Sequence, residues 1–86
     1  MENVEAVVCN VIAAKLRLAT DRVVPEARII EDLGATSLDS VDTIMALEDA
    51  FGLDINDAEA ERLKTVGDVI VLMTMKSEYR DRALAN

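Results

Sequence analysis

Histidine is absent from this 86-residue chain, and only Phe51 and Tyr79 are aromatic. Without histidine the chain lacks the commonest general base and the commonest metal ligand, so neither an enzyme nor a metal site is expected. The single cysteine, Cys9, excludes an intrachain disulfide and a cysteine-based zinc site, and its apolar surroundings indicate a packing role. The low proline and glycine content favours one folded, mostly helical domain with an aliphatic, methionine-containing core.

Basic residues are missing from the middle of the chain. The net charge is -8, and residues 29–61 contain no Lys or Arg but ten of the 17 Asp and Glu residues. This sign argues against nucleic-acid binding and favours partners with basic surfaces, although a solvated face that keeps the protein soluble is the alternative. The acids around Asp32, Asp39 and Asp42 do not follow the calcium-loop pattern.

Long apolar runs are also missing. The longest, residues 69–75 around Thr74, is too short to span a bilayer. Glu2 and Glu5 stand where a signal peptide would carry positive charge. We therefore expect a cytoplasmic protein that does not insert into membranes.

The apolar positions of residues 3–18 have the spacing of an amphipathic helix. Residues 20–35 lack a helical period and include the only proline, so they predict a long ordered loop, and such loops are often functional. We expect its three large aliphatic side chains to turn inward, namely Ile29, Ile30 and Leu33.

Residues 37–51 form the strongest predicted helix. Thr36 is a good N-cap, Asp39 completes a capping box, and Gly52 is placed as a C-terminal stop. The next segment predicts a short helix that runs to about Leu63 from a cap at Asn56 or Asp57. A final helix follows the cap residue Thr65, and its polar tail, residues 76–86, is expected to extend the helix before fraying.

Two apolar stripes run along the helix predicted for residues 37–51. At about 100° per residue, one stripe faces the core and a second lies beside it: Ile44, Leu47 and Phe51, then Leu38, Val41 and Met45. This arc is wider than a small surface helix usually buries. Either the whole arc packs against other helices, or the second stripe is an exposed strip bordered by Asp42 and Asp49 and suited to a basic-rimmed partner.

Ser37 lies where a glycine-containing loop meets the start of this helix. Free backbone N–H groups and the positive end of the helix dipole favour an attached phosphate there. A serine that only caps the helix is the equally open alternative from chemistry alone. Catalysis by Ser37 is not expected, because no histidine is available as its base and no oxyanion pocket is indicated.

Residues 31–42, Glu-Asp-Leu-Gly-Ala-Thr-Ser-Leu-Asp-Ser-Val-Asp, closely resemble the signature of acyl carrier proteins. The likeness extends over most of the chain, to about Met73. It implies an all-α fold, a four-helix bundle with a long first loop and a short third helix, as a single carrier domain over residues 1–86. It also implies that Ser37 receives 4'-phosphopantetheine from coenzyme A and that the chain is a carrier, not an enzyme.

The resemblance also assigns roles by position. The partner-binding face would comprise Leu38, Asp39, Val41, Asp42, Met45, Glu48 and Asp49. The cavity for the acyl chain would be lined by Ile44, Leu47, Phe51, Ile55 and Leu63. The implied partners of this monomeric carrier are a phosphopantetheinyl transferase and acyl-transfer, condensing and reducing enzymes with basic docking patches. These enzymes would belong to fatty-acid biosynthesis or to specialised lipid or polyketide biosynthesis.

Two features depart from the family pattern. Thr36 replaces the usual Asp before the serine, which removes a negative charge beside the modification site. The tail beyond Met75 is longer than expected. Both features point to a specialised carrier. Thr36 alone favours the alternative, a helical interaction module that kept the fold but not the arm.

Overall fold

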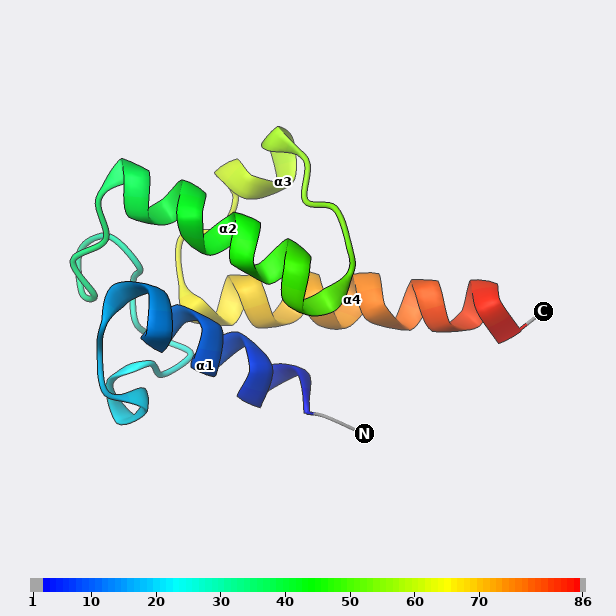
Figure 1. The fold of residues 1–86 in the computed structure, drawn as a ribbon, viewed down its shortest axis with the longest axis horizontal. Coiled ribbons are helices and arrows are strands. Elements are labelled where there is room, and N and C mark those ends of the chain that lie inside the picture. Colours follow the sequence, from blue (N-terminus) through cyan, green and yellow to red (C-terminus); the bar gives the residue numbers. More distant parts are fainter. Residues whose placement is uncertain (1–2, 86) are drawn as a thin grey trace.

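The computed structural model describes residues 3–85, and these form four α-helices and one 3-10 helix (Figure 1). The elements are α1 (Val4–Leu16), η1 (Thr20–Arg22), α2 (Ser37–Phe51), α3 (Asp57–Glu61) and α4 (Val66–Ala85). Within the described residues there is no strand, only an isolated bridge between Arg28 and Thr65. The predicted all-α fold with a long first loop and a short third helix is confirmed.

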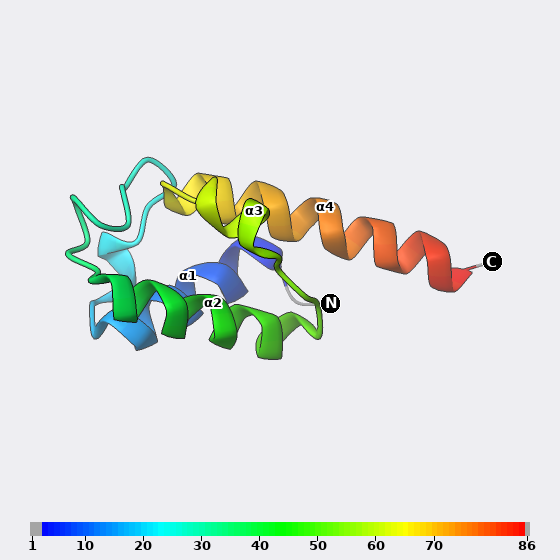
Figure 2. The ribbon, with the colours of Figure 1, turned by 90° about the horizontal axis from the view of Figure 1, so that it is seen from above.

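The core lies between α1, α2 and α4. Figure 2 shows these helices side by side, with α3 over α2 and α4, and the C-terminal part of α4 extending beyond the others. The largest fully buried side chains are aliphatic or methionine, as the composition predicted: Val8, Ile12, Leu47, Val66, Val69 and Met73. Full burial of one such side chain contributes roughly 1.5–3 kcal/mol, so this cluster is the main source of stability.

Helix α1 begins and ends at clear backbone signals. The side chain of Asn3 accepts a hydrogen bond from the Glu5 N–H, at 2.8 Å, and caps the first turn. The helix ends at Leu16, two residues earlier than predicted. The reason is that Arg17 adopts a left-handed conformation, with φ of 59°, and closes the helix through its N–H to the Ala13 carbonyl.

The long loop turns inward at two of its three expected positions. Ile29 and Leu33 are buried, but Ile30 is 57% exposed, so the prediction for Ile30 was wrong. The cause is a tight, helix-like turn in which the Asp32 and Gly34 N–H groups bond to carbonyls four residues back. In such a turn residues 29 and 33 share one face, and residue 30 faces away from it.

The loop is attached to the segment between α3 and α4 and to the first turn of α4. The Ile29 N–H donates to the Lys64 carbonyl at 2.9 Å, and the Gly67 N–H donates to the Pro25 carbonyl at 2.8 Å. Gly67 permits this approach, because a Cβ at that position would lie 3.1 Å from the Pro25 oxygen. These bonds hold the residues before α2 close to the start of α4.

Capping boxes start three helices. Thr36 with Asp39, Asn56 with Glu59, and Thr65 with Asp68 each exchange two side-chain to backbone bonds. The predicted caps at Thr36 and Thr65 are confirmed, and of the two candidates for α3, Asn56 and Asp57, the cap is Asn56. Helix α3 ends at Glu61, two residues early, because the chain tightens into a turn with bonds between residues three apart.

Residues 76–85 continue α4 as helix. Lys76 forms an ion pair with Glu59 of α3, and the Arg80 guanidinium donates to the Phe51 carbonyl at the end of α2. This part of the tail is therefore in contact with the body of the protein. Among the described residues, no helix combines the length and apolar character needed to cross a bilayer.

Candidate functional site

Ser37 is the first residue of α2 and is exposed. The cap of this helix is supplied by the preceding residue, since the Asp39 N–H donates to Thr36 Oγ1 at 3.1 Å. The Asp39 carboxylate in turn accepts from the Thr36 N–H at 3.0 Å. The cap therefore does not require the Ser37 hydroxyl, which argues against the interpretation that Ser37 only caps the helix.

The start of α2 is electrostatically suited to negative charge. The hydrogen bond from the Thr36 N–H, then that from its side chain, holds the pKa of Asp39 below its usual range, and the positive charge of Arg17 contributes. Gly34, with φ of 76°, gives the loop the left-handed turn that leads into this helix. Backbone N–H groups of the first turn remain without helical acceptors, which favours a phosphate close to Ser37.

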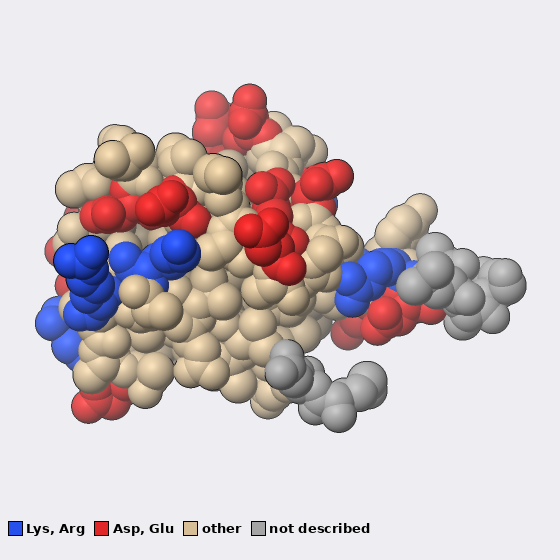
Figure 3. Space-filling view, viewed as in Figure 1, with Lys and Arg blue, Asp and Glu red and all other residues tan. Residues whose placement is uncertain are grey.

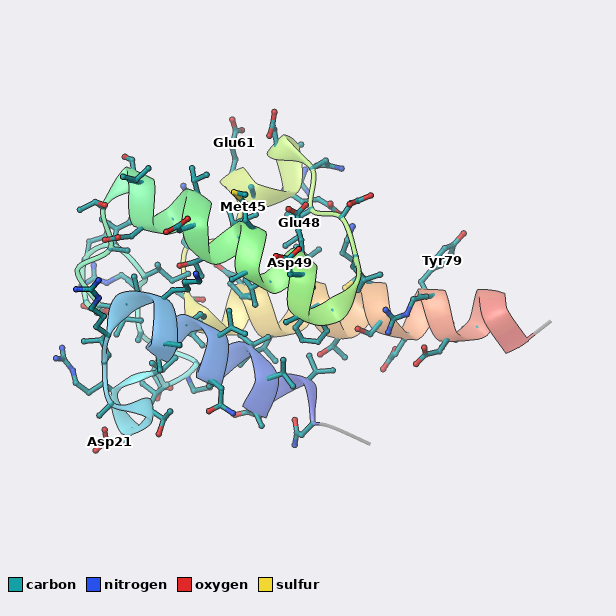
Figure 4. All side chains as sticks on the ribbon, in the orientation of Figure 1. Asp21, Met45, Glu48, Asp49, Glu61 and Tyr79 are labelled. Carbon is teal, nitrogen blue, oxygen red and sulfur yellow. The ribbon has the colours of Figure 1, made fainter. Side chains whose placement is uncertain are left out.

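The second apolar stripe of α2 is exposed. Leu38, Val41 and Met45 are 76%, 55% and 57% exposed, so the hypothesis of an exposed strip is confirmed over that of a fully buried arc. Asp42 and Asp49 are exposed as well. In Figure 4, Met45 and Glu61 of α3 project from the same side of the molecule. On the face drawn in Figure 3, acidic side chains gather over α2 and α3, whereas basic ones gather where α1 ends and on α4.

Two of the predicted partner-binding residues have contacts within the chain. Asp39 is part of the capping box. Glu48 is partly buried and accepts the Ile55 N–H at 2.8 Å, so its carboxylate fastens the loop between α2 and α3. The other five predicted residues form the strip and its acidic border, which we call the α2 face: Leu38, Val41, Asp42, Met45 and Asp49.

A cavity of about 330 Å³ opens between the long loop, the first part of α2, α3 and the start of α4. Three of the five predicted cavity residues line it: Ile44, Leu47 and Leu63. Phe51 and Ile55 are not part of its lining and pack against the core instead. Phe51 lies in the last turn of α2 and Ile55 in the loop that follows, whereas the cavity lies beside residues 40–47.

Several residues of this cavity were not predicted from the sequence. Ile29, Ile30, Ala60 and Val69 add apolar wall, and the charged residues Arg28, Glu31, Glu61 and Lys64 also line it. Two hydroxyl residues of α2, Ser40 and Thr43, complete the lining. Their helical position could have revealed them, because Thr43 stands one turn before Leu47 on the core-facing stripe.

A second exposed apolar stripe lies on α4. Val71, Met75 and Tyr79 are 58%, 62% and 77% exposed and follow one another at four-residue spacing. Figure 4 shows Tyr79 projecting from α4 well away from α2. This stripe was not predicted from the sequence.

Comparison with known proteins agrees with this geometry. The family model described as the phosphopantetheine attachment site matches residues 6–72. A curated acyl carrier protein from Thermosynechococcus vestitus is 51% identical over 76 residues, which are 88% of this chain and 89% of the relative. The structure of an acyl carrier protein from Mycobacterium tuberculosis matches with a TM-score of 0.74 and 34% identity, over 80% of this chain and 92% of that chain.

The helical fold and the family match define a small domain that carries a prosthetic arm. The chain belongs to the phosphopantetheine attachment-site family and, within it, to the acyl carrier proteins. Its cofactor is accordingly 4'-phosphopantetheine, and it is a non-catalytic carrier that a phosphopantetheinyl transferase modifies and that biosynthetic enzymes use.

Proposed function

We propose that Ser37 Oγ is the attachment point of the arm. One observation carries this proposal: Ser37 is an exposed hydroxyl at the first residue of α2, and Thr36 supplies the helix cap in its place. The cavity begins one turn further along, at Ser40, so an arm fixed at Ser37 starts close to the cavity lining. The residues present therefore fit the group that the family carries.

The attachment reaction follows from the chemistry of the two groups. Ser37 Oγ forms a bond to the phosphorus of coenzyme A that bears the pantetheine arm, and the pyrophosphate P–O bond on that phosphorus breaks. Adenosine 3',5'-bisphosphate leaves. The serine proton passes to a base of the transferase, because this chain has no histidine to accept it.

Once formed, the phosphodiester is an anion at the positive end of α2. Such a charge contributes about 0.3–1 kcal/mol at an exposed helix start. The thiol at the end of the arm supplies the thioester to which acyl groups are attached. Ser37 thus serves as an anchor, and α2 fixes where the arm leaves the protein.

We also propose that the cavity shelters the acyl chain. Ile44, Leu47 and Leu63 give it aliphatic walls, and each methylene removed from water contributes about 0.8 kcal/mol. Burial of several methylenes therefore favours the enclosed chain over the solvated one. We propose that the cargo comes from fatty-acid biosynthesis or from specialised lipid or polyketide biosynthesis.

The α2 face is the proposed docking site for partner enzymes. Its exposed apolar side chains and bordering carboxylates complement a partner surface with an apolar centre and a basic rim. Acyl-transfer, condensing and reducing enzymes, as well as the transferase, are the partners that the carrier role requires. We propose that the protein works as a monomer in the cytoplasm, in keeping with its strongly negative charge.

Intact mass spectrometry tests the attachment site. The protein is incubated with coenzyme A and a broad-specificity phosphopantetheinyl transferase, and the parent is compared with Ser37→Ala and Ser40→Ala. Ser40 is the matched control, because it lies one turn further on the same helix and its hydroxyl already donates to the Thr36 carbonyl.

The expected result is a gain of one phosphopantetheine in the parent and in Ser40→Ala, and none in Ser37→Ala. Modification of Ser37→Ala would move the site elsewhere. No gain by folded parent protein with several transferases would support the unmodified interaction module instead, and Thr36→Asp would then be the first variant to try.

A further inference from the structure

Thr43 is a polar residue on the core-facing, otherwise apolar stripe of α2. It is 4% exposed, lies on the core-facing side of α2 one turn before Leu47, and lines the cavity together with Ile44 and Leu47. A cavity needed only for an alkyl chain would be better served by an aliphatic residue there. A buried hydroxyl in such a wall lowers the affinity for plain hydrocarbon, since its remaining hydrogen-bonding capacity goes unused.

The hydrogen bonds of Thr43 show what capacity remains. Its hydroxyl donates to the Asp39 carbonyl at 2.8 Å, which uses its one hydrogen. A hydroxyl oxygen still has two lone pairs, so Thr43 Oγ1 can accept but not donate. Ser40, also in the cavity lining, is in the same condition, since its hydroxyl donates to the Thr36 carbonyl at 3.1 Å. The α2 wall of the cavity therefore includes two residues whose hydroxyl oxygens can still accept a hydrogen bond.

We propose that Thr43 is a specificity-determining residue that favours acyl chains bearing a hydroxyl group over unsubstituted chains. A hydroxyl on the chain can donate to Thr43 Oγ1. An unsubstituted chain has no donor to offer, so it leaves the lone pairs of Thr43 Oγ1 unused. This inference rests on the proposed function, because it requires the acyl chain to be carried on the arm and to enter the cavity.

A double-mutant cycle tests the inference. Its two changes are Thr43→Val in the protein and removal of the hydroxyl group from the acyl chain. The parent and Thr43→Val are loaded with octanoyl- or 3-hydroxyoctanoyl-phosphopantetheine from the corresponding coenzyme A thioesters, and intact mass confirms each load. Urea unfolding then gives the folding equilibrium constant of each of the four proteins and of the two unacylated forms. Valine has nearly the shape of threonine, so the cycle isolates the hydroxyl pair.

We expect the hydroxyl on the chain to improve the folding equilibrium constant more in the parent than in Thr43→Val, by about three- to tenfold, the range of one ordinary hydrogen bond. Thr43→Ser retains the hydroxyl and should retain the coupling. Thr74→Val is the matched control, because Thr74 makes the same bond to a carbonyl four residues back, to Ile70 at 2.7 Å, and is not in the cavity lining. It should show no coupling.

Each contrary outcome has a separate meaning. Coupling below about twofold, or equal coupling in Thr74→Val, overturns the role of Thr43. Loaded chains that leave the folding equilibrium unchanged from the unacylated form show that the cavity is not used, which overturns this inference but leaves the carrier function standing. Failure to load Ser37 removes the proposed function and, with it, this inference.

Discussion

The ammonium nitrogen of Lys76 lies 2.9 Å from both carboxylate oxygens of Glu59. Both side chains are about three-quarters buried, and one Glu59 oxygen also accepts the Asn56 N–H that closes the capping box of α3. The bond from Lys76, then that from Asn56, lowers the pKa of Glu59. A single carboxylate thus joins the start of α3 to the C-terminal half of α4.

Removal of this ion pair should loosen α3. Helix α3 has five residues, none of them buried, so few other contacts hold it. In Lys76→Met the α3 amides should exchange with solvent roughly threefold faster or more, whereas those of α1 should not change. Native-state hydrogen exchange measures both helices in one experiment.

Arg28→Met is the control for this variant. It removes an ion pair of similar length, with Asp32 at 3.0 Å, but both of those side chains are much more exposed, at 59% and 40%. Exposed pairs contribute little, so α3 should not respond. Unchanged α3 exchange in Lys76→Met would mean that the backbone alone positions this helix.

The apolar side chains of the α2 face should matter for partners and not for stability. Met45→Ala and Leu38→Ala should change the free energy of unfolding by less than about 0.5 kcal/mol, because both residues are exposed. They should lower kcat/KM of the transferase for the carrier by about fivefold or more, as expected for central interface residues.

Val71→Ala provides a control of matched exposure. Val71 is 58% exposed against 57% for Met45, but it lies on α4, outside the acidic segment. The kcat/KM of the transferase for Val71→Ala should stay at the value for the parent. An equal loss in Val71→Ala would place the transferase on α4 and contradict the assignment of the α2 face.

Local signals in the sequence were sufficient for much of the fold. The caps Thr36 and Thr65 were predicted correctly, and the cap of α3 was narrowed to Asn56 or Asp57, because a capping box involves only residues three apart. The ends of α1 and α3 were each two residues off, since they depend on turns that several residues determine together. The prediction that Ile30 faces inward was wrong, because a compact turn, not the pattern of apolar residues, decides which loop side chains face inward.

The candidate site was predictable where it lies on a single helix. The periodicity of α2 placed Leu38, Val41 and Met45 together, and the structure decided between exposure and burial. Periodicity puts Thr43 on the core-facing stripe of α2, but it does not predict the cavity beside it, because the other walls come from the long loop, α3 and α4. The same holds for Lys76 with Glu59, which are 17 residues apart in the sequence.

Charge on the α2 face should act mainly on the rate of encounter. In the double variant Asp42→Asn, Asp49→Asn, association with a basic-rimmed partner should slow and depend less steeply on ionic strength, because screened attraction is lost. Stopped-flow binding at several salt concentrations measures this. The double variant Asp21→Asn, Glu26→Gln removes equal charge from exposed positions of the long loop and should leave the salt dependence close to that of the parent. Equal effects in both would indicate that only net charge matters.

Acid should weaken the helix starts through the capping carboxylates. The pKa of Asp68 is lowered chiefly by the backbone N–H of Thr65 and then by that of Lys64, both 3.0 Å from one carboxylate oxygen. A carboxyl group whose pKa is lower in the folded protein stabilises it fully above the unfolded pKa of about 4. That contribution is lost as the pH falls through the folded pKa.

Asp68→Asn isolates this effect, because the amide oxygen can still accept the two N–H groups but does not ionise. The difference in free energy of unfolding between the parent and Asp68→Asn should be constant from about pH 7 to 5 and should shrink below that, as Asp68 of the parent becomes protonated. Urea unfolding at pH values from 7 down to 3 measures it. Val71→Ala changes no ionisable group, so its difference from the parent should not vary with pH. The difference in free energy of unfolding for Asp68→Asn could instead stay constant down to pH 3. In that case the charge of the Asp68 carboxylate does not stabilise the protein, and the cap acts through hydrogen-bond geometry alone.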